Sequence, residues 1–331
     1  MMKKGKVYLS IALLLVCLSL FGCSQETKKT VRVGEVTHSI FYAPQYVALS
    51  KGFFEEEGLD VELKTTWGGD KTMTSLLSDG IDVALVGSET SIYVQSQGAD
   101  DPVVNFAQLT ENDGTFLVAR EKIENFSWEQ LKGSTFLGQR KGGMPQMVGE
   151  YVLKQHNIDP KQDLELIQNI DFANVANAFA SGTGDYVQLF EPTASIFEQE
   201  GKGHIVASFG SESGKVPYTS FMAKESYLTE NEETMKKFTR ALYKAQKWVD
   251  EHSAEEVAKE IAPQFEDTSL KTIETVVDRY KSQDSYAKDP LLNKAEWNQL
   301  EEIMKEAGEL PKNVDYTKLV NTKIAKKAME E

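Results

Sequence analysis

Residues 46–63, YVALSKGFFEEEGLDVEL, carry the pattern that decides the fold. Residues 43–51 read as a helix, and Gly52 follows as the residue type that commonly ends one. Two phenylalanines and three glutamates then form an apolar wedge and an acidic turn. Residues 59–63 alternate leucine or valine with charged residues, which is typical of a strand with one polar face. The stretch predicts one helix–strand unit of an α/β sheet.

The same alternation of strands and helices continues on both sides of this unit. Before residue 110, strands are predicted at 31–36, 81–86 and 103–108, with helices at 71–78 and 89–97. A second series has strands at 134–137, 164–167, 185–189 and 204–208, with helices at 144–155, 173–180 and 193–200. Strand–helix alternation at short spacing indicates a mostly parallel sheet with helices on both faces. The sequence therefore predicts an α/β protein with two similar lobes.

Two extended segments, 116–118 and 219–222, mark the places where the chain crosses between the lobes. We predict that residues 31–117 and 219–331 form the first lobe and that 118–218 form the second. The chain has 331 residues, a length that suits about two domains. The part after residue 225 is almost wholly helical, with helices predicted at 231–252, 269–280, 294–307 and 317–329. Open α/β sheets bind ligands beyond the carboxyl ends of their strands, so facing lobes would enclose a cleft.

The first 22 residues have the features of an export signal. Three lysines precede an apolar stretch at 7–21, which is too short for a stable membrane span. Cys23 directly follows Leu-Phe-Gly, which resembles the lipobox of bacterial lipoproteins and implies lipidation of Cys23 after cleavage before it. Residues 23–30 then read as a lipidated tether that holds the protein to the extracytoplasmic face of the cell membrane. The alternative is an ordinary cleaved signal with an incidental cysteine.

Composition and motifs exclude several other classes of protein. The formal net charge of −15 disfavours binding to nucleic acid. The four histidines lie far apart, and no phosphate-binding loop, dinucleotide fingerprint or nucleophile elbow occurs. Because Cys17 lies in the signal, Cys23 is the only cysteine of the mature chain. We therefore expect a monomer that is not an enzyme and uses no cofactor or metal.

The quoted stretch closely resembles one in solute-binding proteins of ABC transporters, in the sulfonate, taurine, nitrate and thiamine-pyrimidine group. Residues 76–84 (LLSDGIDVA), 137–145 (LGQRKGGMP) and 190–192 (FEP) resemble other pieces of that family in the same order. The resemblance implies a type II periplasmic-binding-protein fold, a two-lobed clamshell. It also implies that the lobes close on a small solute and deliver it to permease and ATPase subunits of the importer.

Two other functions remain as alternatives to import. The same fold family includes a fungal pyrimidine synthase that uses a cysteine-rich iron site, which a chain with one mature cysteine does not fit. A surface sensory binding protein is not distinguished from an importer component by sequence.

Candidate binding residues follow the predicted strands. In the first lobe they offer hydroxyl, imidazole, aromatic and backbone groups: His38, Phe41, Tyr42, Trp67, Gly68, Ser88 and Thr110. In the second lobe they are Arg140, Gly142, Gly143, Asp171, Tyr186 and Glu191. The aromatic rings favour a pyrimidine-like ligand, whereas Arg140 with its glycine loop favours a sulfonate or other small oxyanion. Both ligand classes stay open at this point.

Overall fold

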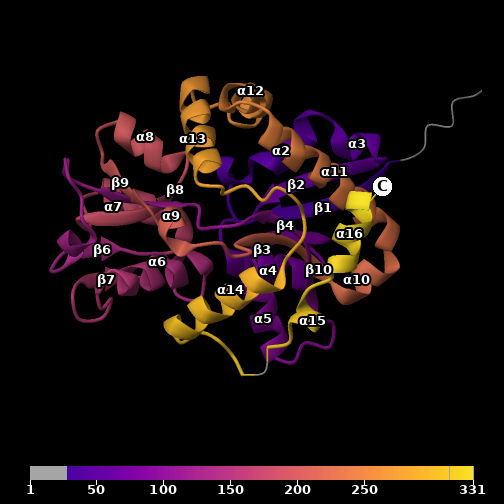
Figure 1. Ribbon diagram of the computed structural model, residues 1–331, viewed down its shortest axis with the longest axis horizontal. Coiled ribbons are helices and arrows are strands. Elements are labelled where there is room, and N and C mark those ends of the chain that lie inside the picture. The colour runs from indigo at the N-terminus through magenta and orange to yellow at the C-terminus, as the bar shows by residue number, and fades with distance from the viewer. Residues whose placement is uncertain (1–27, 313, 331) are drawn as a thin grey trace, which may run out of the picture.

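Two five-stranded sheets, one in each lobe, form the frame of the computed structural model, which describes residues 28–312 and 314–330 (Figure 1). The first sheet has the order β2-β1-β3-β10-β4 and contains β1 (Lys29–Glu35), β2 (Leu59–Thr65), β3 (Val83–Gly87), β4 (Val103–Thr110) and β10 (Thr219–Lys224). The second has the order β7-β6-β8-β5-β9 and contains β5 (Thr115–Ala119), β6 (Thr135–Leu137), β7 (Glu165–Ile167), β8 (Tyr186–Phe190) and β9 (His204–Ser208). The predicted two-lobed α/β fold is confirmed.

Each sheet has four strands in one direction and one strand in the other. The reversed strands are β10, which pairs antiparallel with β3 and β4, and β5, which pairs antiparallel with β8 and β9. These are the strands that the chain enters on crossing between the lobes. Because the parallel strands of both lobes end at the cleft, a strand that enters from the cleft must run the opposite way. The predicted crossings at 116–118 and 219–222 are thus full members of the sheets.

The quoted stretch forms the expected helix–strand unit, with one difference. Helix α2 (Ala43–Ser50) ends before Gly52, whose φ of 72° is the left-handed conformation that glycine adopts at little cost. The acidic turn is itself a short helix, α3 (Phe53–Glu56), since the Glu56 N–H donates to the Gly52 carbonyl at 2.9 Å. Phe54 is buried against Phe238, with ring centroids 4.8 Å apart.

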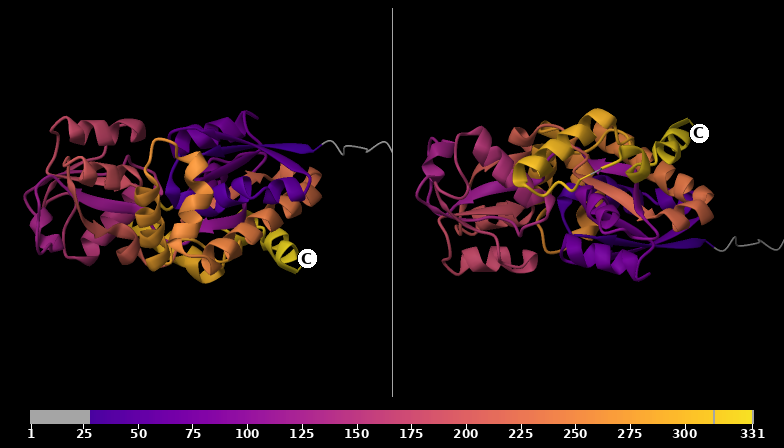
Figure 2. Two further views of the ribbon diagram at one scale, coloured as in Figure 1. Left: turned by 90° about the horizontal axis from the view of Figure 1, so that it is seen from above. Right: turned by 90° about the horizontal axis from the view of Figure 1, so that it is seen from below.

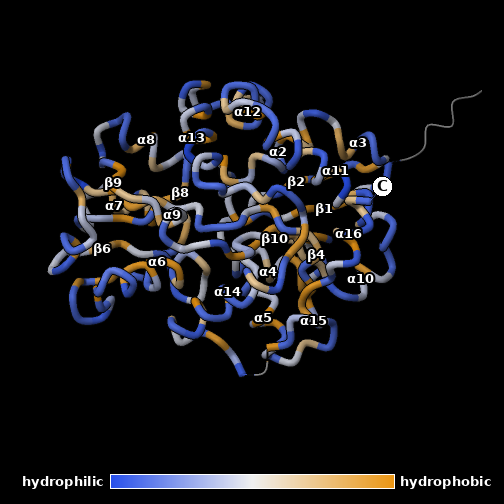
Figure 3. The backbone as a smooth tube through the Cα atoms, in the orientation of Figure 1, coloured by the Kyte–Doolittle hydropathy of each residue, from blue (hydrophilic) through white to orange (hydrophobic). Residues whose placement is uncertain are grey.

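The other helices cover the sheets or pack beyond them, and the hydrophobic residues concentrate in the strands between (Figure 3). The helices before β10 are α4 (Gly69–Leu77), α5 (Glu89–Ser96), α6 (Met144–Gln155), α7 (Val175–Ala180), α8 (Thr193–Gln199) and α9 (Phe209–Ser213). Those after it are α10 (Glu225–Glu230), α11 (Glu232–Glu251), α12 (Ala254–Ile261), α13 (Leu270–Ser282), α14 (Lys294–Ala307), α15 (Tyr316–Leu319) and α16 (Thr322–Glu330). The helix predicted at 317–329 is two helices, α15 and α16.

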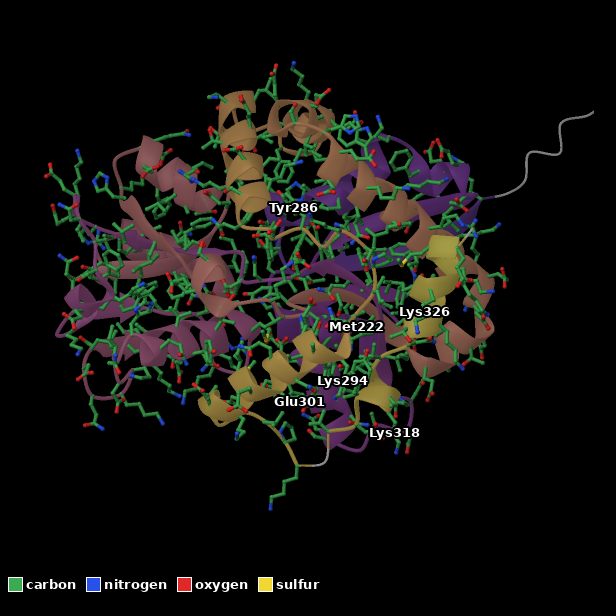
Figure 4. The ribbon with its side chains drawn as sticks, viewed as in Figure 1. Met222, Tyr286, Lys294, Glu301, Lys318 and Lys326 are labelled. Carbon is green, nitrogen blue, oxygen red and sulfur yellow. The ribbon has the colours of Figure 1, made fainter. Side chains whose placement is uncertain are left out.

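The C-terminal helices contact both lobes rather than the first alone (Figure 2). Helix α14 packs on α6 of the second lobe, where Gln299 Nε2 donates to the Tyr151 hydroxyl at 3.3 Å. One turn earlier on the same helix, Glu296 accepts a hydrogen bond from Gln108 of β4 at 3.1 Å. The segment between α13 and α14 carries Tyr286, labelled in Figure 4, whose hydroxyl donates to the Ile40 carbonyl at 3.0 Å.

The N-terminal predictions fall mostly outside the described residues. These are the signal peptide, Cys23 and the first part of the tether. Strand β1 already begins at Lys29, inside the stretch predicted as tether, and the Lys29 N–H donates to the Gly58 carbonyl at 2.9 Å. Among the described helices, none is both long enough and apolar enough to cross a membrane.

Candidate functional site

A pocket lies between the lobes, where the parallel strands end. Its cavity volume is about 140 Å³, which limits a ligand to a small molecule. The first lobe contributes residues 36, 42, 67–71, 86–87 and 89–90, and the second contributes 139–145, 171–172 and 190. Residues 218–219 of the returning crossing complete the lining. This is the place at which fold topology alone predicts a ligand.

The structure brings seven of the thirteen predicted binding residues to this pocket. They come from loops after β1, β2, β6 and β7, and they are Tyr42, Trp67, Gly68, Arg140, Gly142, Gly143 and Asp171. Trp67 has a φ of 59°, unusual for a residue with a side chain, and 47% of its surface is exposed. Backbone strain of this kind gathers at functional sites, and here it holds a large ring at the rim of the pocket.

Three predicted residues lie in the junction between the lobes and do not line the pocket. Phe41 is fully buried, and its ring centroid is 5.1 Å from that of Tyr280 and 5.6 Å from that of Tyr218. Ser88 and Thr110 are buried beside β10: their hydroxyls hydrogen bond to Ser220 and Thr219, each at 2.9 Å. These side chains join the crossing strand to its neighbours.

His38, Tyr186 and Glu191 also lie outside the pocket lining. His38 stacks on Phe265, and its ring nitrogens lie 2.7 Å from the Gln264 carbonyl and 3.1 Å from Glu35 Oε1. Burial lowers the pKa of His38, but the hydrogen bonds to Glu35 and Gln264 outweigh it and leave the pKa raised. Tyr186 packs near Phe126 at the far side of lobe two.

Glu191 is paired with a cation instead of facing the pocket. Its Oε1 lies 2.6 Å from Nη1 of Arg279 on α13, and its Oε2 accepts the Ser195 N–H at 2.8 Å. The Glu191 carbonyl also accepts a hydrogen bond from the Ser39 hydroxyl at 2.5 Å. This residue therefore ties the second lobe to α13 and to the first lobe.

Arg140, the best anion-binding candidate in the sequence, has carboxylate partners within the protein. Its Nη2 lies 2.9 Å from Asp70 Oδ2 on the first lobe, and its Nη1 lies 3.5 Å from Asp171 Oδ1 on the second. All three side chains are about half exposed, so each pair contributes little to stability. An incoming oxyanion would meet a guanidinium that is already paired with two carboxylates, although Lys71 and Lys141 also line the pocket.

The pocket lining also includes residues outside the predicted set, such as Phe172, Phe190 and Tyr218, which add aromatic surface. Gln139 and Glu89 matter most among the polar ones. Gln139 Nε2 donates to the Gln188 carbonyl at 2.6 Å, and its Oε1 is buried without a hydrogen-bond partner among the described residues. Glu89 opens the helix after a continuous apolar strand, a position that reads as an ordinary helix start and so hides its place at the cleft.

Relatives with known names share the sequence or the fold. The chain is 66% identical to "Putative binding protein YtlA" of Bacillus subtilis (strain 168) over 99% of this chain and 96% of that protein. It is 26% identical to the formylaminopyrimidine-binding protein of Halalkalibacterium halodurans, over 77% of each. The alkanesulfonate-binding protein SsuA of Xanthomonas axonopodis pv. citri, solved with bound MOPS, superposes with a TM-score of 0.69 at 18% identity, over 88% of this chain and 98% of that one.

The sequence profile of the NMT1-like family matches residues 24–263, which is well over half of the chain. The profile spans both sheets and the residues around the pocket. Together with the two-lobed structure and its neighbours, this match shows that the chain belongs to the NMT1-like family and has the periplasmic-binding-protein fold.

Proposed function

We propose that the protein is the extracytoplasmic solute-binding component of an ABC importer. The observation that carries this proposal is a small pocket whose two walls belong to different lobes and touch each other across it. Arg140 pairs with Asp70 across the pocket, and the Met144 N–H donates to Glu89 Oε1 at 3.1 Å. Hinge rotation would break these contacts, expose the pocket and close it again on a solute, and the closed form would dock on the permease.

The lining favours a pyrimidine-like aromatic solute over a sulfonate. Aromatic rings surround the pocket: Tyr42, Trp67, Phe172, Phe190 and Tyr218. Arg140 is already paired with Asp70 and Asp171, so the main candidate for binding a free oxyanion is engaged within the protein, although Lys71 and Lys141 also line the pocket. The formylaminopyrimidine-binding relative agrees with the aromatic class, and the alkanesulfonate-binding neighbour supplies the competing class to be tested.

Isothermal titration calorimetry with two probes tests this proposal. We expect 4-amino-2-methylpyrimidine to bind the purified protein with a Kd in the micromolar range or below, corresponding to about 8 kcal/mol or more. We expect ethanesulfonate to give no measurable heat of binding. Binding of ethanesulfonate alone would replace the aromatic class by the oxyanion class, and binding of neither probe would reject both.

Replacing Trp67 with alanine should weaken binding of 4-amino-2-methylpyrimidine about tenfold. A stacked ring contributes about 0.5–1.5 kcal/mol beyond the area that it buries. The matched control is Leu77→Ala, since Leu77 is 43% exposed on α4 of the same lobe and does not line the pocket. If the Trp67→Ala and Leu77→Ala variants bound the ligand with equal affinity in calorimetry, Trp67 would not contact the solute.

We also propose that Cys23 carries the lipid that keeps this monomeric protein at the membrane. Changing Cys23 to serine should move most of the protein from the membrane fraction to the medium or periplasm of the producing cells. Several acyl chains anchor a protein stably because each buried CH₂ contributes about 0.8 kcal/mol. Fractionation and immunoblotting measure the change, and Ser24→Ala is the control. An unchanged membrane fraction in the Cys23 variant would count against the anchor.

A further inference from the structure

Glu89 is an ionisable group buried in the wall of the pocket. It lies at the start of α5, is 3% exposed, and lines the pocket together with Gly87 and Met144. Its Oε1 accepts the Met144 N–H from the other lobe at 3.1 Å, whereas Oε2 has no hydrogen-bond partner among the described residues. A buried carboxyl oxygen without a partner is costly unless something else binds it.

The backbone makes room for this carboxyl group. The side chain of Glu89 folds back over Gly87, and a Cβ at position 87 would overlap both carboxyl oxygens. Gln139, on the opposite lobe, adds a second buried acceptor without a partner among the described residues. Each wall of the pocket therefore contains a residue with a buried acceptor that has no hydrogen-bond partner among the described residues.

Burial, and not a charged neighbour, sets the protonation state of Glu89. Tyrosines face it from three elements: Tyr42 of the turn η1 (Ile40–Tyr42), Tyr93 of α5, and Tyr218 before β10. The charged residues in the pocket wall are Asp70, Lys71, Arg140, Lys141 and Asp171, and the structure gives Glu89 no ion pair with any of them. Burial raises the pKa of Glu89 to about 8, so the group is mostly protonated at neutral pH.

We propose that Glu89 is the residue that recognises the solute, by pairing with a ring nitrogen and an adjacent exocyclic amino group. A protonated carboxyl group donates one hydrogen bond and accepts others, which matches the acceptor and donor on that edge of an aminopyrimidine. A sulfonate offers acceptors only, so it could accept the proton of Glu89 but would leave the acceptor Gln139 Oε1 unpaired. The inference rests on the proposed function and names the edge of the ligand that the pocket reads.

The same pairing makes solute binding depend on pH. The carboxyl group and the ring share one proton, so above pH 8 the ionised Glu89 must take up a proton when a neutral ring binds. Affinity of the wild-type protein should then fall by up to tenfold for each pH unit between about 8 and 10. Burial raises the pKa of Tyr42, Tyr93 and Tyr218, so these phenols keep their protons over that range.

Calorimetry on the full mature chain tests the inference with 4-amino-2-methylpyrimidine and with 2-methylpyrimidine, which lacks the amino group. The wild-type protein should prefer the amino compound at least tenfold. Glu89→Gln should bind it about 10- to 100-fold more weakly than wild type does, with affinity independent of pH between 8 and 10. The matched control is Glu150→Gln, a buried glutamate on α6 that accepts hydrogen bonds from Gln146 and Gln168 and lies outside the pocket lining.

The outcomes separate this inference from the proposed function. Binding of both pyrimidines with equal affinity, no pH dependence and no effect of Glu89→Gln would overturn the role of Glu89 and leave an aromatic-solute protein. Binding of ethanesulfonate alone would overturn the role of Glu89 and the aromatic ligand class, and would leave a solute-binding protein for oxyanions. If Glu89→Gln does not fold, as thermal unfolding would show, the pH series and the amino preference of the wild-type protein still decide the matter.

Discussion

Replacing Phe41 with alanine should lower the free energy of unfolding by about 3–5 kcal/mol. Phe41 is fully buried at the junction of the lobes, among Tyr42, Phe190, Tyr218 and Tyr280. Its ring lies so close to Gly114, in the first crossing, that a Cβ there would come within 2.7 Å of three ring atoms. The Gly114 backbone lies on one side of the Phe41 ring and the aromatic rings lie on the other. These groups cannot move far enough to fill the cavity that the alanine substitution would leave.

Urea unfolding followed by circular dichroism measures this effect, with Leu270→Ala as the control. Leu270 is 43% exposed at the start of α13, so its loss should cost less than about 1 kcal/mol. A cost below 1 kcal/mol for Phe41→Ala would mean that the junction is not tightly packed. If Phe41→Ala kept its stability but lost its affinity for the solute, Phe41 would be a solute-binding residue instead.

Replacing Arg279 with methionine should destabilise the protein by about 3–5 kcal/mol at neutral pH, because it leaves the carboxylate of Glu191 buried without its cation. The Glu191 side chain is fully buried and Arg279 is 26% exposed, with 2.6 Å between Oε1 and Nη1. Arg279 also donates to the Ser195 hydroxyl at 2.8 Å. The ion pair thus holds α13 to the segment that follows β8.

The pH dependence of that loss identifies its cause. Burial already raises the pKa of Glu191, although Arg279, the next largest influence, opposes the shift. Removing the arginine should raise the pKa further, so the folded state would bind a proton more tightly than the unfolded state. Its stability would then fall as pH rises through the folded-state pKa and recover below pH 4, where Glu191 is protonated in both states.

Urea unfolding at pH 4 and pH 7 should therefore show a smaller cost of Arg279→Met at the lower pH. Lys271→Met is the control on the same helix, since Lys271 pairs with Glu274 in solvent at 3.1 Å and should cost less than about 1 kcal/mol. The double variant Glu191→Gln, Arg279→Met should recover part of the lost stability. A cost independent of pH would assign the effect to lost packing.

Sequence periodicity predicted most of the fold because both lobes are built from local units. The helix at 144–155 and the strand at 204–208 match α6 and β9 at both ends. Helix α12 was not predicted, although Ser253 and Glu256 form the capping box that begins it. The direction of β5 and β10 in the sheets depends on the crossings between lobes, which no local pattern encodes.

The candidate site was predicted only as far as loop position determines it. Trp67 and Arg140 follow strands and lie at the pocket, as the rule of strand carboxyl ends requires. Phe41 and Ser88 also follow strands, but their side chains turn toward the junction of the lobes, which depends on contacts distant in sequence. Glu89 follows a strand and lines the pocket, but only the folded structure shows that its carboxyl group accepts the Met144 N–H from the other lobe.

The position of α14 has a mechanical consequence. The two crossing strands β5 and β10 would by themselves form a flexible hinge between the lobes. Helix α14 contacts β4 through Glu296 and α6 through Gln299, so it bridges the lobes and stiffens that hinge. Any swing of the lobes must slide α14 along one of these partners or flex the connector 283–293. The proposed movement would therefore take its stiffness and its range from the last third of the chain, although none of the residues described there lines the pocket.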